Sequence, residues 1–428
     1  MPMPTRADTA WFTLDLNGRT DFAVYSFTGS EAVCRPYEFA IELVHPSPSE
    51  DVTAFIGTPA LLRIRDKSGA DRPVHGLVRE MRRLHRGNHL THYQCNIVPR
   101  LWFLGLRRNH RIFQHKSVPD IITCLLEEQN FTAESFAFKC FRDYPAREYC
   151  VQYGESDLHF LSRLCEEEGI YFYFEHAEDG HRLCFSDMPG GPRISGESDL
   201  RYFPGSGQPA DTAVVSRLTL RARSVSGKAT LRDWNFLTPS LIPEGTDTAT
   251  APAAPGIDYD VYRFPHLHQT QAEGTHYAGL ELLRQLAMRT SLQAEADVSR
   301  FLPGHTFLLH GHDREEVNAA WWIVDADCRG VQPQALGREA PDRGMTYAAW
   351  LTAIPETTRF VPLSDHPKNR IIGDQTAIVV GPASEEIHPD AYGRVKVQFF
   401  WDREGKRDEK SSCWIRVSQG WAGTGFGT

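Results

Sequence analysis

The alternation of apolar and polar residues over the first hundred positions limits the possible folds more than any other feature. The runs FAVYSF, YEFAIELV, LLRIRD, VHGLVREMRRL and HYQCNIV each alternate with the period of a strand that buries one face. Turn-prone residues separate the first two runs, namely Gly29 and the CRP tripeptide at 34–36. This series predicts a meandering antiparallel barrel or sandwich over residues 1–100.

Two helices are predicted within residues 101–200. Residues 117–129 place their apolar side chains on one helical face, with Ser117 as the N-cap and Asp120 three positions later. Residues 155–169 repeat the arrangement, with Ser156 as the N-cap and Gly169 as the stop. The apolar face of this second helix would consist of Leu158, Leu161, Leu164 and Cys165. Both segments are therefore predicted to be short amphipathic helices.

A second β-rich module is predicted over residues 201–361. It would contain a third helix at 270–297, opened by the capping pair Thr270 and Glu273, and the strands HTFLLHGH and AWWIVDADC. Residues 186–215 and 238–257 are rich in Gly, Pro, Ser, Thr and Ala. We expect both of these segments to be loops or linkers, the second of them mobile.

The last segment, residues 362–428, has too few strands for a complete domain. Residues 395–401 alternate as a strand, eight of the nine residues at 402–410 are charged, and a second strand is predicted at 413–418. A lone hairpin is marginally stable, so the segment is expected to pack on the rest of the chain or on other chains through Phe400 and Trp414. The charged loop should stay solvated. The predicted fold class is mainly β with interspersed helices (α+β).

Composition argues against several classes of function. The balance of 46 Lys+Arg against 55 Asp+Glu gives a net charge of -9, which removes the positive field that nucleic acid binding exploits. The first residues lack the basic and apolar parts of a signal peptide, and no apolar run approaches the ~18 residues of a membrane-spanning helix. The nine cysteines never form a CxxC pair, which predicts reduced, mostly buried thiols.

Two groups of histidines lie close enough in sequence to be considered as metal ligands. His85, His89 and His92 flank a Gly-Asn turn between two strand-like runs, so the helical spacing of a zinc site does not apply. His310 and His312 would project from one strand face, which supplies two ligands and no obvious third. We expect these histidines to be solvated or packed, and we predict no metal site.

Motifs for phosphate binding and hydrolysis are incomplete. RARSVSGKAT has Ala222 where a phosphate-binding loop needs its first glycine, and Ala229 follows Lys228 where Ser or Thr is required. No GxSxG nucleophile elbow occurs. The acidic run Glu166, Glu167 and Glu168 falls on the last turn of a predicted helix, which favours a solvated face or helix-end packing over a glycosidase pair. The sequence predicts no catalytic and no cofactor-binding residues.

Four blocks of the chain, in the expected order, resemble the VgrG family of trimeric spike proteins from bacterial type VI secretion machines. The first three are YSFTGSEAVCRPYEFAIEL, VPRLWFLGLRRNHRIFQHKSVPDII and REYCVQYGESDLHFLSRLCEEEGIYFYFEH. The fourth joins LTAIPETTRFVP to HPDAYGRVKVQFFWDREGKRDEKSSCWIRVSQGWAG. The resemblance implies a phage-tail-hub-like part with two related β-barrels, then a small barrel of the oligonucleotide-binding (OB) type, then a trimeric β-helical needle.

This resemblance sets the expected organisation. Residues 1–100 would form the first hub barrel, 101–200 a helix-containing middle region, 201–361 the second hub barrel, and 362–428 part of the OB-type barrel. Such a barrel needs about five strands, so the resemblance places its remainder beyond Thr428. Three chains with two similar barrels each would make a pseudo-sixfold ring that can seat on the hexameric Hcp tube.

The resemblance also implies a structural, non-catalytic function. The expected protein is a homotrimeric hub that adapts the Hcp tube to a puncturing tip and carries effectors into target cells. Implied partners are the Hcp tube, baseplate components and, through the needle, a PAAR-type tip protein and effectors; no cofactor, nucleic acid or stable membrane insertion is implied. Such a protein would be made in the cytoplasm and secreted by the machine without a signal peptide.

Two alternatives stay open at this point. The chain could be the hub or spike of a related contractile injection machine or of a phage tail. It could also be an enzyme-bearing spike whose effector domain lies outside these residues.

Overall fold

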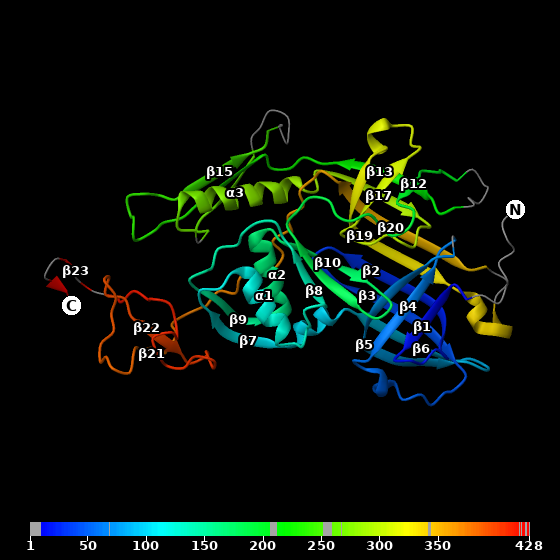
Figure 1. Ribbon diagram of the computed structural model, residues 1–428, viewed down its shortest axis with the longest axis horizontal. Helices are drawn as coiled ribbons and strands as arrows, with labels where there is room; N and C mark the ends of the chain where they lie inside the picture. Colours follow the sequence, from blue (N-terminus) through cyan, green and yellow to red (C-terminus); the bar gives the residue numbers. More distant parts are fainter. Residues whose placement is uncertain are drawn as a thin grey trace. The chain divides into compact units, whose positions relative to one another are not determined.

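The computed structural model describes residues 10–418 except 68, 206–211, 251–258, 267 and 341–343, together with 420, 422, 423, 426 and 427 (Figure 1). The chain forms two compact units. The first comprises Met1–Trp102, Thr132–Phe141 and Gly169–Leu363, and the second comprises Phe103–Phe131, Arg142–Glu168 and Ser364–Thr428. The four consecutive domains expected from the sequence stay a prediction.

A closed six-stranded antiparallel barrel begins the first unit. Its strands are β1 (Phe12–Leu16), β2 (Ala23–Ala32), β3 (Arg35–His45), β4 (Pro59–Arg65), β5 (Asp71–Arg86) and β6 (Thr91–Val98). They follow the order β1-β4-β5-β6-β3-β2, and the pairing of Thr13 with Ala23 returns from β2 to β1. Phe39, Ile41 and Leu43 alternate along β3 and are fully buried. The barrel predicted over residues 1–100 is confirmed.

A second ring of six strands lies later in the same unit. It contains β12 (Asp199–Arg201), β13 (Val215–Ala222), β17 (Thr290–Ala296), β18 (Thr306–His310), β19 (Ala320–Val331) and β20 (Thr346–Pro355). The pairings run β13-β17-β20-β19-β18-β12, and a bridge between Tyr202 and Val215 joins β12 back to β13. At this bridge the Phe203 amide donates to the Val215 carbonyl at 2.9 Å.

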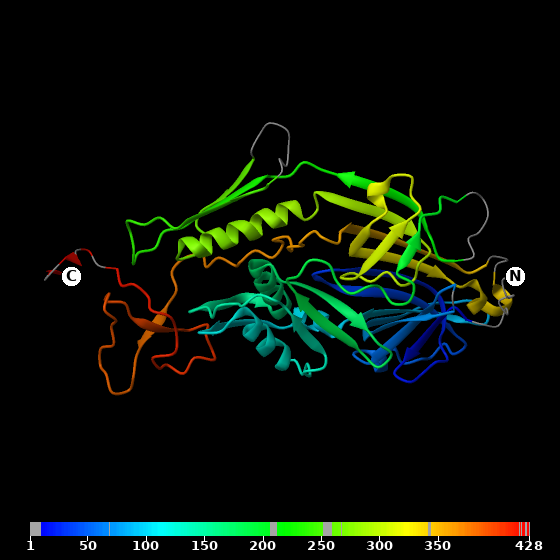
Figure 2. The same cartoon turned by 45° about the horizontal axis from the view of Figure 1, so that its top comes forward.

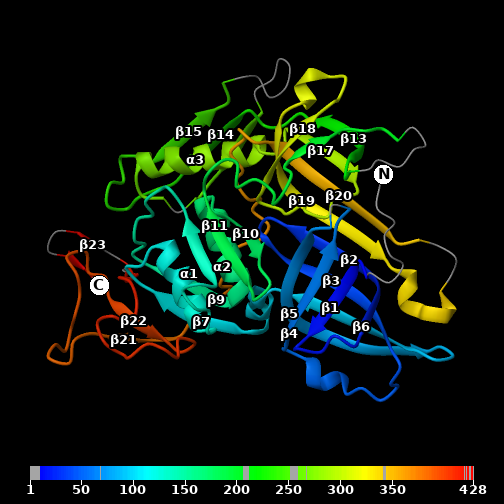
Figure 3. The same ribbon diagram turned by 45° about the vertical axis from the view of Figure 1, so that its right-hand side comes forward.

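One continuous sheet joins the two barrels. Strand β2 of the first pairs with β19 of the second in antiparallel register, from Ser26 opposite Val331 to Ala32 opposite Asp325 (Figure 3). A smaller sheet adds β8 (Phe136–Lys139), β10 (Tyr171–His176) and β11 (His181–Ser186). Tyr171 and Tyr173 from β10 share a buried cluster with Trp322 and Ile354 from β19 and β20. This cluster fixes the smaller sheet to the second barrel.

The first unit also carries a helix packed on a three-stranded sheet. The helix α3 (Gln271–Leu286) lies along β14 (Lys228–Arg232), β15 (Glu244–Thr248) and β16 (Asp260–Arg263) (Figure 2). A Cβ atom on Gly245 would lie 1.9 Å from the carbonyl carbon of Gly274, so glycine is required for this close approach. Short 3-10 helices occur at Val52–Phe55, Glu315–Val317 and Pro333–Glu339.

The second unit contains the two predicted short helices. They are α1 (Val118–Glu127) and α2 (Asp157–Glu168), accompanied by the paired strands β7 (Arg108–Phe113) and β9 (Cys150–Ser156). Ser117 and Asp120 form the expected capping box, and the Ser156 hydroxyl accepts from the His159 amide at 3.2 Å. A 3-10 segment, Arg100–Leu106, precedes β7. Both helix predictions are confirmed.

The third helix is shorter than predicted. It ends at Leu286, and Thr290–Ala296 forms β17 instead. Leu292, Ala294 and Ala296 are buried on alternate positions of β17, which pairs with β13 on one side and β20 on the other. Two hydrogen-bonded neighbours and a buried face outweigh the helix propensity of the Gln, Ala and Glu residues in this segment.

Both segments predicted as loops contain a strand. Residues 186–215 include β12, which pairs in parallel with β18, and residues 238–257 include β15, which pairs with β14. The partner of β12 is distant in sequence, and the partner of β15 is its hairpin neighbour. The local composition of these segments gives no information on either pairing, so both strands were missed. Residues 251–257 of the second segment, for which mobility was expected, lie outside the described residues.

The terminal hairpin was also predicted wrongly. Strand β22 (Lys396–Phe399) pairs with β21 (Ala377–Val380), whereas residues 413–418 contribute a single bridge between Val395 and Ile415. Two short strands, β23 (Ala422–Gly423) and β24 (Phe426–Gly427), pair with each other at the end.

Within the described helices, none has the length and apolarity that a membrane span requires.

Candidate assembly surfaces

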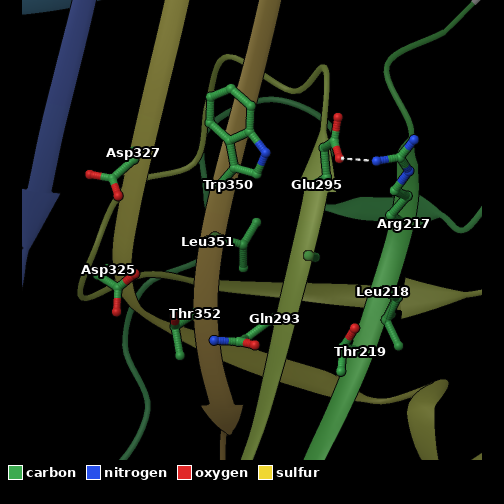
Figure 4. A pocket seen from close by; sticks show the side chains of 11 residues that line it. Arg217, Leu218, Thr219, Gln293, Glu295, Asp325, Asp327, Trp350, Leu351 and Thr352 are labelled. Carbon is green, nitrogen blue, oxygen red and sulfur yellow. Dashed lines mark hydrogen bonds and ion pairs between the residues drawn. The ribbon is translucent and has the colours of Figure 1, made fainter.

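A shallow concave surface of about 420 Å³ lies on the outer side of the second barrel (Figure 4). Strand register builds it as two rows of side chains across β19, β20, β17 and β13. In one row Asp327 lies opposite Trp350, which lies opposite Glu295, which lies opposite Arg217. The side chain of Trp350 is prominent here because 43% of this residue is exposed.

The second row of the concave surface is polar. Asp325 lies opposite Thr352, Thr352 opposite Gln293, and Gln293 opposite Thr219. Burial raises the pKa of the Asp325 carboxyl, and the nearby Asp327 carboxylate raises it further, whereas the hydrogen bond from Thr352 and the charge of Arg35 oppose this rise. Both rows together present three carboxylates and one guanidinium. The surface is therefore acidic around an exposed indole.

The terminal segment of the second unit exposes large apolar side chains. Ile372 is 93% exposed, and several neighbours are more than half exposed: Val379, Ile387, Tyr392 and Phe400. The only regular sheet that the described residues form between 364 and 420 is the two-stranded β21-β22 pair. A two-stranded hairpin with this much apolar exposure needs a further packing partner for stability.

Two predicted features of this segment differ in the structure. Trp414 does not face outward unpaired, because its ring lies 5.1 Å from the His388 ring and under the Lys396 ammonium group. The charged loop is not wholly solvated either, since Asp402 is buried and its carboxylate accepts the amides of Glu404 and Gly405. An acceptor within a tight turn explains why this one charge can be buried.

A dense ion-pair network holds the end of α2. Arg163 binds Glu155 through two hydrogen bonds of 2.7 and 2.9 Å, and both side chains are almost fully buried. Arg163 and Arg147 each donate to Glu167 at 2.6 Å, and Arg147 also donates to Glu168 at 2.6 Å. Burial alone would raise the pKa of Glu167, but the two arginine charges outweigh it and lower the pKa to about 2.

His366 and Pro367, which lead into the terminal segment, are hydrogen-bonded to side chains of α2. The amide of His366 donates to Glu166 at 3.0 Å, and His366 Nδ1 lies 2.6 Å from the other oxygen of the same carboxylate. The ring of His159 lies 5.0 Å from that of His366, and its Nε2 is 3.0 Å from the Pro367 carbonyl. The hydrogen bond to Glu166 raises the pKa of His366 despite its partial burial.

We expect the contact between His366 and Glu166 to weaken as pH rises. A histidine with a raised pKa in the folded state contributes stability that is full below its unfolded pKa, about 6.5, and is lost as pH rises through the folded value. Hydrogen exchange of residues 364–369, corrected for intrinsic rates, should therefore speed up as pH rises above about 6.5. Glu166→Gln should abolish this pH dependence, and an unchanged pH profile in that variant would contradict the assignment.

Comparison with known proteins decides the family. Residues 30–334 match the model of the phage tail baseplate hub (GPD) family. The chain belongs to this family of hub proteins. The match runs from the end of β2 to the end of β19 and its following 3-10 turn, so it covers most strands of both barrels, and the predicted hub-like architecture is confirmed.

Curated relatives of this hub chain are type VI spike proteins of the VgrG type. It is 40% identical over 98% of its length to the type VI secretion system spike protein VgrG4b of Pseudomonas aeruginosa, and 38% identical over 98% to VgrG5 of the same organism. The chain spans about half of these relatives, 53% and 54% respectively. The VgrG resemblance noted in the sequence is thereby confirmed.

A solved structure shows the same fold. The E. coli c3393 protein, described as a type VI secretion component similar to T4 tail proteins gp27 and gp5, matches with a TM-score of 0.69. The match covers 94% of this chain and 92% of that one at 22% identity.

The histidines of the hub chain are spread over separate sites. His85 stacks on His92, and His92 Nδ1 lies 2.8 Å from Glu42. His310 ends β18, but His312 follows Gly311 outside the strand, so the expected shared face does not exist. Across the described ranges, no group of three or more His, Cys, Asp or Glu side chains is placed to hold a metal ion.

The remaining sequence candidates also find structural roles. Lys228 and Ala229 lie within β14, and Lys228 pairs with Asp260 at 3.2 Å, so this segment forms a strand and no phosphate loop. The acidic run at the end of α2 is not a solvated face, because Glu166 and Glu168 are buried, and this burial agrees with helix-end packing, the other expected alternative. Sequence reasoning could not find their partners, since Arg142, Arg147 and His366 lie outside the helix.

Proposed function

We propose that this chain is the non-catalytic hub of a type VI secretion spike, and that three copies assemble into a ring. The ring adapts the hexameric Hcp tube to the puncturing tip. The observation that carries this proposal is the presence of two six-stranded barrels in one chain, joined by a continuous sheet. Three such chains present six barrels, and a sixfold arrangement matches a hexameric tube.

The naming of the curated relatives supports a structural function, since both are called spike proteins. In this proposal sheath contraction supplies the mechanical work, and the hub needs rigidity and symmetric contacts. Baseplate components, a PAAR-type tip protein and effectors are the further partners, the last two through the needle. The protein is made in the cytoplasm and leaves the cell with the machine. The hub of a phage tail is the second candidate, supported by the family match.

The exposed apolar side chains of the terminal segment support assembly around a threefold axis. Phe400 is 65% exposed, on a segment whose own sheet has only two strands. Packing against the same segment of two other chains would remove this apolar surface from water. Phe400 is therefore a proposed contact of the trimer.

The mass of the purified chain in solution tests the proposal. We expect three times the mass of one chain by native mass spectrometry and by light scattering. Phe400→Glu should shift the equilibrium toward monomer, because the introduced charge would be buried at the interface. Phe141→Glu is the matched control, since Phe141 is 84% exposed in the other unit. A monomer at every concentration would contradict the trimer.

A further inference from the structure

Two carboxylates of the concave surface on the second barrel form no ion pair with any described residue, although the Arg35 charge acts on Asp325 from beyond ion-pair distance. Asp325 and Asp327 stand two positions apart on β19 and point to the same side, as Figure 4 shows. Glu295 is partly neutralised by Arg217 at 3.3 Å. Within the described ranges no ion pair forms on Asp325 or Asp327. Like charges so close on one sheet face destabilise the free surface slightly.

A basic hairpin tip lies on the first barrel. Strand β5 runs five residues beyond its last buried position, Met81, and every one of residues 82–86 is exposed. Arg82 pairs with Glu80 at 2.6 Å. Arg83 and Arg86 form no ion pair with any described residue, and Leu84 between them is 43% exposed. The tip therefore offers two available guanidinium groups beside an apolar side chain.

We propose that the β5-β6 hairpin tip of one chain docks on the concave surface of a second copy. The surface formed by Asp325, Asp327 and Trp350 receives Arg83 and Arg86 of the neighbour. This inference rests on the trimer of the proposed function and assigns its contact surfaces.

Charge complementarity identifies the hairpin tip as the group that binds the concave surface. Arginine stacks on an indole and pairs with carboxylates at the same time, which suits Trp350 flanked by Asp327 and Glu295. Tryptophan and arginine are also the residues that most often dominate the binding energy of interfaces. The neighbour's guanidinium groups would relieve the repulsion between Asp325 and Asp327.

The geometry of assembly supports a contact between different surfaces. A ring with cyclic symmetry needs a heterologous contact, in which one patch of each chain meets another patch of the next. The hairpin tip and the concave surface are such a pair, one on each barrel. Contact of the acidic surface with its own copy is disfavoured by like charge.

Charge reversal provides the test. Asp327→Arg and the double variant R83E/R86E should each weaken trimer formation by about tenfold or more, measured by sedimentation equilibrium of the whole chain. Combining the three substitutions restores opposite charges and should recover most of the affinity. The wild-type trimer should also weaken as salt concentration rises.

Two variants control for nonspecific charge effects. Asp313→Arg alters an aspartate whose side chain is 88% exposed outside the concave surface, and Arg223→Glu alters an exposed arginine just after β13. Neither should change assembly. Circular dichroism and hydrogen exchange of the barrel strands verify that every variant is folded.

The outcomes separate this inference from the proposed function. If the association constant of the trimer is unchanged in D327R and in R83E/R86E, the docking contact is overturned, and the trimer of the proposed function is unaffected. Weakening in both variants without recovery in their combination shows that the two surfaces do not meet, and it also overturns the inference. A wild-type chain that never associates overturns the trimer and the contact together.

Discussion

Replacing Arg163 with methionine is expected to destabilise α2 and its surroundings by about 3 to 5 kcal/mol, the cost typical of breaking a buried ion pair. The side chains of Arg163 and Glu155 are 3% and 1% exposed, and two hydrogen bonds join them. The methionine fills part of the volume but leaves the Glu155 carboxylate buried without its cation. Glu167 would lose one of its two arginines as well.

Hydrogen exchange of the α2 amides measures this loss, because it reports the free energy of opening for that unit. Arg82→Met is the matched control: Arg82 is 55% exposed at the side chain and pairs with Glu80, and an exposed pair contributes at most about 1 kcal/mol. Adding Glu155→Leu to Arg163→Met should recover much of the stability, because no unpaired charge then stays buried. Equal, small losses from Arg163→Met and Arg82→Met would contradict the assignment of a buried pair.

Helix positions were predictable because their signals are local. Ser117 and Asp120 form a capping box within four residues of each other, and apolar spacing within the same segment defines the buried face of α1. The same holds for α2, where Ser156 caps the start and Gly169 follows the end with φ +69. No information from distant parts of the chain was needed.

Strands whose pairing is distant were among those missed. β12 is three residues long and is ordered by β18, more than a hundred positions later. β17 has a composition that suits a helix, and its place between β13 and β20 decides its conformation. Register across strands is set by the whole sheet, which a window of local sequence does not contain.

The candidate surfaces were predictable only in part. The exposure expected for Phe400 agrees with the structure, because a short terminal segment offers little to cover it. The concave surface was missed because Asp327, Trp350 and Glu295 are adjacent only through strand pairing. The two aspartates of AWWIVDADC, two positions apart, were the one available signal, and an ordinary solvated strand face would show the same spacing.

Shortening Leu161 to alanine is expected to cost about 2 to 5 kcal/mol, the range for truncating a fully buried leucine. Leu161 and Leu164 are both 0% exposed, one turn apart on the face of α2 that was predicted from spacing to be apolar. Three carbon atoms would be removed from a site that no water reaches, and the cavity left behind adds to the lost transfer free energy. Urea denaturation of the whole chain should show a lower midpoint for this variant.

Leu158→Ala on the same helix is the matched control, since Leu158 is only partly buried and its truncation opens toward solvent. We expect it to cost less than half as much as Leu161→Ala, because a site that water can enter carries little cavity penalty. Equal losses from the two variants would mean that α2 buries Leu158 as deeply as Leu161. That result would place the helix in a different rotation about its axis, and the contacts of Arg163 and Glu166, which depend on the same rotation, would have to be reassigned with it.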